Sequence, residues 1–389
     1  MLLLDELVTF YTSNTFEFNS DTVKTKAMAL AVVVLMALVS VQMIFVSDDS
    51  DAASITVKDG EGTEFTFDSP ANKIITIGVG VTATAIGVGA LDKIVVCDSY
   101  SKTNSDKIFD DLKKYVEEGK IAANGNIYSS GKDQLKTDII DAAEPTKENH
   151  FDKEKDVVMA VVSPSYKANL SFLEENGFKN VMYWSTVNDY DDIIDFVETI
   201  SKVCNGKVYD KAASMRAVAD KITSTLEKAD VVKAKAFYVT YSSGTFKVGN
   251  TTSITTAMIE AAGGEVITKD PSKSASTIEV NLTELVANNP DAIIFADSQV
   301  FNSGEHMKNL RTAVGNDVTI KGLEAIWNNF SIESAKGVWA MAGSMYPDLF
   351  DGDMPSGGGS DDNTMLYIGA GAVAVVIILV AAYFFMRSK

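Results

Sequence analysis

Cysteine and histidine are almost absent from this chain of 389 residues. Cys97 and Cys204 are its only cysteines, and His150 and His306 are its only histidines. No CxxC motif or cysteine–histidine cluster occurs, so a structural zinc or iron–sulfur site is not expected. The same scarcity argues against a Ser-His-Asp triad. Two buried free thiols are the favoured interpretation of the cysteines, and a disulfide between them is the alternative.

Basic residues are also few compared with acidic residues. The chain has 34 Lys and Arg residues against 53 Asp and Glu residues, which gives a net charge of −19. Such a chain repels the phosphate backbone of nucleic acids and anionic lipid surfaces, so no nucleic acid partner is expected. The acidic run over residues 189–195 lacks the alternating ligands and central glycine of a calcium loop. We therefore interpret it as the solvated start of a helix, whose N-terminus favours negative charge.

Charge is missing altogether from two long hydrophobic runs. The first covers residues 27–46, about the length that crosses a bilayer as a helix. Lysines precede it and aspartates follow it. Because positive residues stay on the cytoplasmic side, residues 1–26 are predicted to be a cytoplasmic lead, and the chain after residue 46 is predicted to lie outside. The run is either a cleaved signal peptide or an uncleaved signal anchor, and both remain open.

The second run covers residues 365–386, with aspartates before it and Arg387 and Lys389 after it. This orientation is the reverse of the first, so the C-terminus is predicted to be cytoplasmic. Residues 351–364, rich in Gly, Ser and Asp, indicate a flexible stalk. We therefore predict a protein of the cell membrane, with an extracytoplasmic globular domain that the C-terminal transmembrane helix tethers.

The external part alternates short apolar segments with helical ones. After a predicted hairpin over residues 54–67, the predicted strands are apolar on both faces, which indicates parallel sheets covered by helices on two sides. We predict an α/β fold with one lobe at 54–205 and a second at 235–350. Small and apolar residues recur at spacings of three and four over 206–230, which predicts one long inter-lobe helix that acts as a spine. The predicted strands are 74–79, 93–97, 157–162 and 181–184 in the first lobe and 235–241, 265–268, 292–296 and 318–321 in the second.

Two lobes leave a cleft, and loops at the carboxyl ends of parallel strands supply ligand contacts in such sheets. Gly78 and Gly80 form a turn before a predicted helix, but the turn lacks a complete GxGxxG motif and a lysine. Close packing of strand on helix is its favoured interpretation, with contact to a ligand carboxylate or amide as the second.

Aromatic and hydroxyl side chains at the predicted strand ends are the stronger candidates. Flat rings can cover the face of a chelate while hydroxyls fix its edge, although ordinary packing or exposure is an equal alternative for each residue. The candidates are Tyr100, Ser101, Tyr128, Ser163, Tyr166, Trp184, Tyr241, Ser242, Phe246 and Trp327.

Five stretches of the external part carry a resemblance. They are residues 55–101, with a hairpin, a strand, a glycine-rich turn and a second strand, then LSFLEENGFKNVMYW at 170–184, AMIEAAGGEVIT at 257–268, LTELVANNPDAIIF at 282–295 and AMAGSMYPDLF at 340–350. In this order they resemble the cobalamin and iron-siderophore type of periplasmic binding protein of ABC transporters. The resemblance implies two Rossmann-like lobes joined by one long helix, here with N-terminal and C-terminal transmembrane helices added.

The resemblance also implies a function. The protein would capture an iron chelate of the siderophore or haem type, or a corrinoid, and pass it to an ABC permease and ATPase. It would be a binding protein and not an enzyme, with no cofactor and no metal site. Tyr241 and Trp327 fall at loop positions that line the cleft in this family.

One departure from the family pattern bears on import. Family members carry a docking glutamate on the first helix of each lobe, where this chain has Ala83 and Ala257. Docking then uses other acidic residues, such as Glu260, or the protein does not couple to a transporter in the usual way. A membrane-anchored surface interaction or sensory protein that keeps the fold without transport is therefore the alternative.

Overall fold

The computed structural model describes residues 54–128, 131–146 and 150–355. These ranges belong to one compact unit that begins at Ser54. No helix within them is long and apolar enough to cross a membrane. The lead at 1–26, the runs at 27–46 and 365–386, and the stalk from residue 356 onward lie outside the described residues. The membrane topology therefore stays a prediction.

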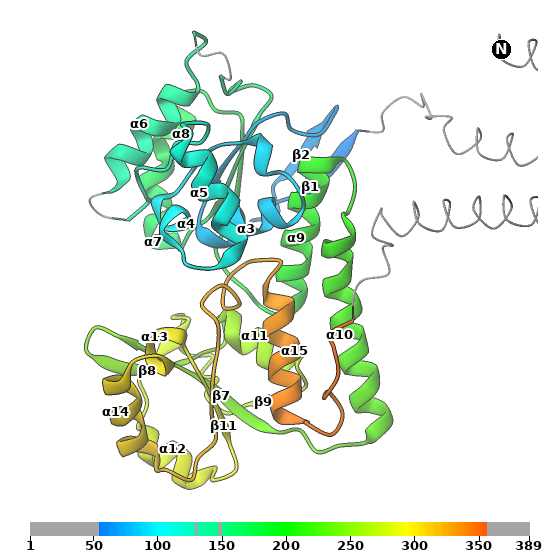
Figure 1. The fold of residues 1–389 in the computed structure, drawn as a ribbon, viewed down its shortest axis with the longest axis vertical. Helices are drawn as coiled ribbons and strands as arrows, with labels where there is room; N and C mark the ends of the chain where they lie inside the picture. Colours follow the sequence, from blue (N-terminus) through cyan, green and yellow to red (C-terminus); the bar gives the residue numbers. More distant parts are fainter. Residues whose placement is uncertain (1–53, 129–130, 147–149, 356–389) are drawn as a thin grey trace, which may run out of the picture. The chain divides into compact units, whose positions relative to one another are not determined.

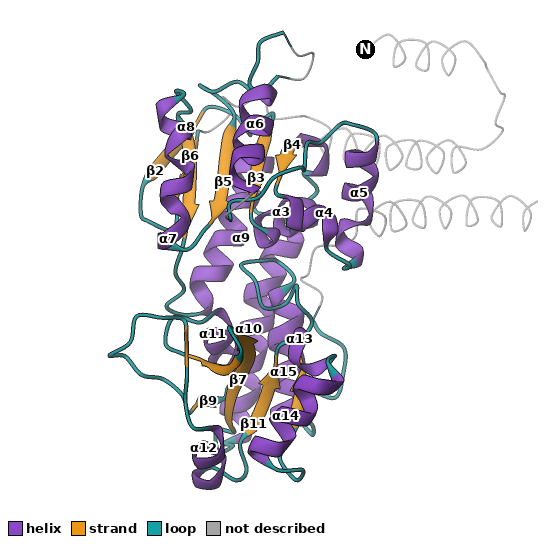
Figure 2. Cartoon of the chain, turned by 90° about the vertical axis from the view of Figure 1, so that its left-hand side faces the viewer, coloured by secondary structure: helices purple, strands orange, loops and turns teal. Residues whose placement is uncertain are grey.

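The first lobe is built on a parallel four-stranded sheet with the strand order β4-β3-β5-β6 (Figure 2). The described elements of this lobe are β1 (Ile55–Lys58), β2 (Glu64–Phe67), β3 (Ile74–Ile77), α3 (Val79–Gly87), β4 (Ile94–Cys97), α4 (Ser99–Thr103), α5 (Asp110–Glu117), α6 (Lys132–Ala142), β5 (Val157–Val161), α7 (Pro164–Lys167), α8 (Ser171–Glu175), β6 (Asn180–Trp184) and α9 (Tyr190–Asn205). The predicted hairpin is confirmed as the antiparallel pair β1 and β2.

Both faces of this sheet are buried. Ile74 belongs to a core that it shares with α3 and α9, whereas Ile75 belongs to a separate core with α6 and α8. Figure 2 shows α6 and α8 against one side of the strands. Because successive side chains of a strand point to opposite faces, a sheet covered on two sides needs apolar residues at every position. This requirement explains the uninterrupted apolar runs in the sequence.

The second lobe contains a six-stranded sheet in the order β10-β8-β7-β11-β12, with β9 beside the start of β7. Its described elements are β7 (Lys235–Ser242), β8 (Thr245–Gly249), α11 (Ile254–Ala261), β9 (Glu265–Val266), β10 (Thr277–Ile278), α12 (Leu282–Asn288), β11 (Ile293–Ala296), α13 (Ser298–Phe301), α14 (Gly304–Val314), β12 (Ile320–Gly322) and α15 (Ser334–Met345). This sheet is mixed, because β8 pairs antiparallel with β7 and β10. The strands predicted for this lobe pair in parallel, and the antiparallel strands β8 and β10 were not predicted.

The turn between β7 and β8 explains the difference. Ser243 and Gly244 both have positive φ, 55° and 85°. Two consecutive residues in this region form the tight turn that matches the twist of an antiparallel hairpin. The hairpin adds β8, a strand that the prediction missed.

The predicted spine corresponds to α10 (Asp210–Ala229), which packs against both α9 and α15 (Figure 1). Its 20 residues give a rod of about 30 Å. The helix starts four residues later than predicted, because Gly206 ends α9 in a left-handed conformation with φ 75°. Arg216 joins α10 to α9 through ion pairs of 3.2 Å to Asp191 and 3.1 Å to Asp195. The acidic run is thus the start of α9, as predicted.

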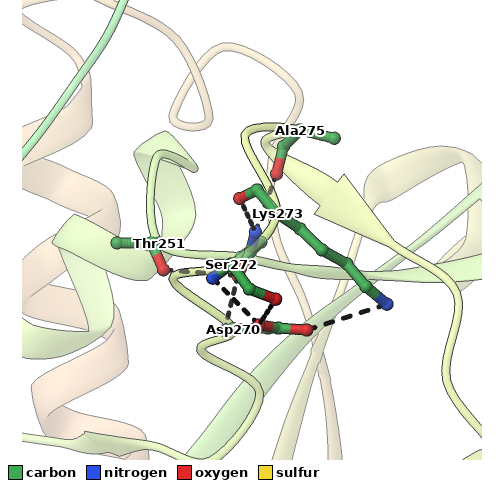
Figure 3. A network of polar contacts seen from close by, with 6 residues as sticks. Thr251, Asp270, Ser272, Lys273 and Ala275 are labelled. Atoms are coloured by element: carbon green, nitrogen blue, oxygen red, sulfur yellow. Dashed lines mark hydrogen bonds and ion pairs between the residues drawn. The ribbon is translucent and has the colours of Figure 1, made fainter.

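A buried asparagine organises the long loop between β9 and β10. The amide of Asn250 donates hydrogen bonds of 2.9 Å to the carbonyls of Lys273 and Ala275, and its oxygen accepts one of 2.7 Å from the backbone of Asp270. Figure 3 shows part of this loop, with Ser272 against the Asp270 carboxylate. The loop therefore depends on one fully buried side chain.

Candidate functional site

A cavity of about 150 Å³ lies where the carboxyl ends of β3, β4 and β5 meet the segment that follows β12. The first lobe contributes Gly78, Tyr100 and Tyr128 to its lining, and the second lobe contributes Asn329 and Phe330. Carboxyl ends of parallel strands are the edge at which α/β sheets place ligand contacts. The cavity is therefore the candidate site.

Asp98 organises the first-lobe side of the cavity. Directly after β4, its carboxylate accepts backbone hydrogen bonds from Gly78 at 2.9 Å, Tyr100 at 2.9 Å and Ser101 at 3.2 Å. Burial raises the pKa of Asp98, while the hydrogen bonds from Gly78 and Ser101 oppose that rise. One carboxylate thus fixes the glycine turn to the start of α4. The prediction missed Asp98, although an aspartate between a buried strand and a Ser-containing helix start is a typical N-cap signal.

The glycine turn serves close packing. Gly78 has φ 112°, and the backbone amide of Gly78 is already donated to Asp98. Gly80 faces the backbone of Phe330 so closely that any Cβ would overlap the Phe330 carbonyl. Both glycines line the cavity, and the packing interpretation of the turn agrees with this geometry.

Three tyrosines form a continuous aromatic surface, which we call the tyrosine wall. The ring centroids of Tyr100 and Tyr128 are 5.9 Å apart, and those of Tyr128 and Tyr166 are 4.7 Å apart. The three side chains are 49%, 38% and 37% exposed. Burial raises the pKa of Tyr128, and the negative charge of Asp98 adds to that rise. The structure thus brings together three residues that the sequence placed in separate segments.

The second-lobe side of the cavity is the segment between β12 and α15. The amide of Asn328 donates a 2.9 Å hydrogen bond to the Tyr238 hydroxyl, which donates one of 2.7 Å to Asp297. Toward the first lobe, the backbone amide of Ile332 donates a 3.1 Å bond to the Thr84 hydroxyl of α3. The segment is therefore fixed to both lobes, and it holds the next residues along, Asn329 and Phe330, at the cavity.

Four candidates of the first lobe are not among the residues that line this cavity, namely Ser101, Ser163, Tyr166 and Trp184. Ser101 is fully buried, and its hydroxyl lies within hydrogen-bond distance of the Thr82 hydroxyl and the Asp98 carboxylate, both at 3.0 Å. Ser163 is exposed and bonds to the Ser165 hydroxyl at 2.9 Å. Trp184 is buried, with its ring 5.0 Å from that of Phe196. Packing, not ligand contact, accounts for Ser101 and Trp184 in this structure.

The candidate residues of the second lobe are not among those that line this cavity. Tyr241 packs at 5.1 Å against Phe246 and at 4.1 Å against His306, measured between ring centroids. Ser242 is exposed at the end of β7. Trp327 is half-buried against Gly337 of α15. Neither Tyr241 nor Trp327 is among the residues that line the cavity.

The described part of the chain contains no reactive thiol and no cluster of metal-binding side chains. Cys97 and Cys204 are both free and buried, which confirms the favoured interpretation. Burial raises the pKa of each thiol, to about 12 for Cys204, so neither is a ready nucleophile. Within the described ranges, no group of three or more His, Cys, Asp or Glu side chains could hold a metal ion.

No protein-family model and no curated protein matches the chain. Its structure is similar to that of Helicobacter pylori CeuE in a Ni-His complex, with a TM-score of 0.55 at 17% identity over 77% of this chain and 90% of CeuE. FepB, a TroA-like periplasmic binding protein from Veillonella parvula, gives 0.53 at 16% identity over 77% and 92%. The haem-binding protein HmuT gives 0.53 at 14% identity over 77% and 89%. At such identities the likeness shows that this chain shares the mixed α/β fold of these proteins.

Proposed function

We propose that this chain is an extracytoplasmic solute-binding protein that captures a metal chelate or corrinoid at the cavity between its lobes. The observation that carries the proposal is the tyrosine wall, in which Tyr100 and Tyr128 line that cavity and Tyr166 packs against Tyr128. Exposed aromatic rings beside a concave, partly apolar site are typical of ligand pockets and not of a plain packing surface. The likeness to CeuE, FepB and HmuT supports the same role.

The size of the cavity limits how the ligand binds. Pockets that enclose a drug-sized ligand have volumes of roughly 300–1,000 Å³, whereas this one has about 150 Å³. The contact between Gly80 and Phe330 and the Thr84–Ile332 hydrogen bond oppose wide opening of the lobes. An edge of the chelate therefore enters the cavity, and the remainder lies over the tyrosine wall. This arrangement suits a compact iron or nickel chelate better than an enclosed haem or corrinoid.

Delivery to an ABC permease and ATPase is the second part of the proposal. Ala83 and Ala257 are buried in α3 and α11, so these positions cannot present a docking side chain to a partner. Glu260 is exposed on α11, where it pairs at 2.8 Å with Lys269, and it remains a docking candidate. The runs at 27–46 and 365–386 would hold the domain at the outer face of the membrane.

The binding test uses the full-length protein in a non-ionic detergent. Calorimetric titration with cobalamin, haem, nickel–histidine and ferric siderophores is expected to give at least one dissociation constant in the micromolar range or tighter. Lack of binding to the whole panel would overturn the proposal. Co-purification of a permease and ATPase from the host membrane would support import, whereas ligand binding without any transporter would favour the sensory alternative.

A further inference from the structure

The cavity has an unusual charge for a site that would hold an anion. Asp98 is the one carboxylate among the described lining residues, and the others are glycine, aliphatic, amide, phenylalanine and tyrosine residues. No lysine, arginine or histidine is among these described residues. Asp98 and Tyr128 line the same cavity, and burial together with the negative charge of Asp98 raises the pKa of the Tyr128 hydroxyl.

The nearest lysines in the sequence do not offset this field. Lys167 follows Tyr166, but its Nζ pairs with Glu61 and lies 4.4 Å from the ring centroid of Tyr183. Lys102 of α4 and Lys132 of α6 are exposed, so solvent and salt screen their charges. An anion in the cavity would lose hydration without gaining a cationic partner.

The tyrosine wall also disfavours an anionic ligand. The face of an aromatic ring carries negative electrostatic potential, so it attracts cations and repels anions. Tyr100 and Tyr128 line the cavity, and all three rings of the wall are partly exposed. A ligand that lies over the wall therefore meets a negative surface backed by the Asp98 carboxylate.

We propose that the site selects neutral or positively charged chelates and rejects chelates with net negative charge. The inference rests on the proposed solute-binding function and narrows its ligand class. It favours hydroxamate chelates and corrinoids without free carboxylates over haem, with its propionates, and over anionic catecholate complexes.

The test is a series of ferric chelates that share one hydroxamate core and differ in charge. Ferrioxamine B carries a pendant ammonium group, N-acetylation makes it neutral, and N-succinylation makes it anionic. Full-length protein in non-ionic detergent is titrated with all three, and with ferric enterobactin and cyanocobalamin as an anionic and a neutral ligand of other chemistry. We expect the anionic members to bind about tenfold more weakly than the neutral and cationic members, or worse.

The outcomes separate the two proposals. Anionic chelates that bind as tightly as their neutral counterparts would overturn the charge selection and leave the solute-binding function intact. No binding by any member would overturn the selection, and it would overturn the solute-binding function as well if haem and nickel–histidine also failed to bind. Raising the salt from about 0.01 M to about 1 M shortens the Debye length from about 30 Å to about 3 Å, so it should bring the three ferrioxamine affinities closer together.

A variant pair tests the site itself. Asn329 is half-buried at the cavity, so Asn329→Lys should raise the affinity for the succinyl derivative relative to ferrioxamine B by about fivefold or more. Asn329→Gln changes the same side chain without adding charge and should leave that ratio unchanged. Because the readout is a ratio, a general loss of affinity in either variant does not affect it. Equal ratios in Asn329→Lys and wild type would contradict the inference.

Discussion

The carboxylate of Asp98 accepts a 2.9 Å hydrogen bond from the backbone amide of Gly78, across 20 residues of sequence. The bond joins the carboxyl ends of β3 and β4, the two strands that start the candidate site. Because Asp98 also caps α4, the position of Tyr100 depends on the same carboxylate. The geometry of the glycine turn and that of the tyrosine wall are therefore coupled through one side chain.

This coupling predicts a specific pH dependence of stability. Burial raises the pKa of Asp98 above its ordinary 3.8, so the folded state keeps a proton that the unfolded state has already lost. Stability from this group is therefore present at low pH and falls as pH rises through the window above 3.8. In Asp98→Asn that titration is gone. We expect the free energy of unfolding of wild type minus that of the variant to fall as pH rises through this window.

Urea unfolding followed by tryptophan fluorescence measures this difference at each pH. A difference in unfolding free energy that is the same at every pH reflects the hydrogen bonds lost in Asp98→Asn. It does not affect how that difference changes with pH. A difference that stays flat or rises with pH would show that Asp98 has no raised pKa in the folded protein.

The contact between Gly80 and Phe330 gives a second prediction. Gly80→Ala places a methyl group against the Phe330 carbonyl, and the backbone of the segment after β12 must move to accept it. Such overpacking costs about 1–3 kcal/mol of unfolding free energy. Gly304→Ala is the matched control, because no atom lies within 4 Å of a Cβ there and the residue begins α14. Its stability in urea should stay the same or rise slightly. Equal stability of the two variants would mean that the lobes are not in contact at Gly80.

Much of this fold could be predicted from the sequence because its local signals are strong. Segments such as 157–162 are apolar at every position, and only a sheet covered on both faces produces that pattern. Strand β8 was missed because TFKVG has polar residues on its exposed side and no apolar run. The sequence does not show whether Gly206 ends α9 or begins the spine helix, because its left-handed conformation is known only from the folded chain.

The site was harder to predict than the fold. Tyr100, Tyr128 and Tyr166 were identified because aromatic residues at strand ends are conspicuous, and three independent segments bring them together. Trp184 has the same signal, but it points into the core against Phe196. Which face of a sheet a strand-end residue occupies depends on the register of distant segments. Asn329 and Phe330 reach the cavity only through the Asn328 and Ile332 contacts, which no local pattern indicates.

The buried amide of Asn250 should be essential to its loop. Asn250→Ala removes the donors to the Lys273 and Ala275 carbonyls and the acceptor for the Asp270 amide. Each buried polar group left unpaired costs about 1–3 kcal/mol, so we expect a loss of about 2–4 kcal/mol in unfolding free energy. Limited trypsin digestion should also cut faster after Lys273. In Ser272→Ala the exposed contact to Asp270 is lost, and both measurements should change little. A rate of cleavage equal to wild type in Asn250→Ala would contradict this role of the asparagine.

The tyrosine wall predicts which side chains the ligand needs. Tyr128 is central, because its ring contacts those of both Tyr100 and Tyr166. Tyr128→Ala removes the middle of the wall and should weaken binding of ferrioxamine B about fivefold or more, the loss expected from one aromatic contact of about 1 kcal/mol. Tyr128→Phe keeps the ring and should retain most of the affinity. Tyr209 is similarly exposed, at 41%, but precedes α10 and does not line the cavity, so Tyr209→Ala is the control for loss of a surface tyrosine. Calorimetry on the full-length protein compares all three variants. Wild-type affinity in Tyr128→Ala, in a protein that does bind the chelate, would place the ligand away from the wall.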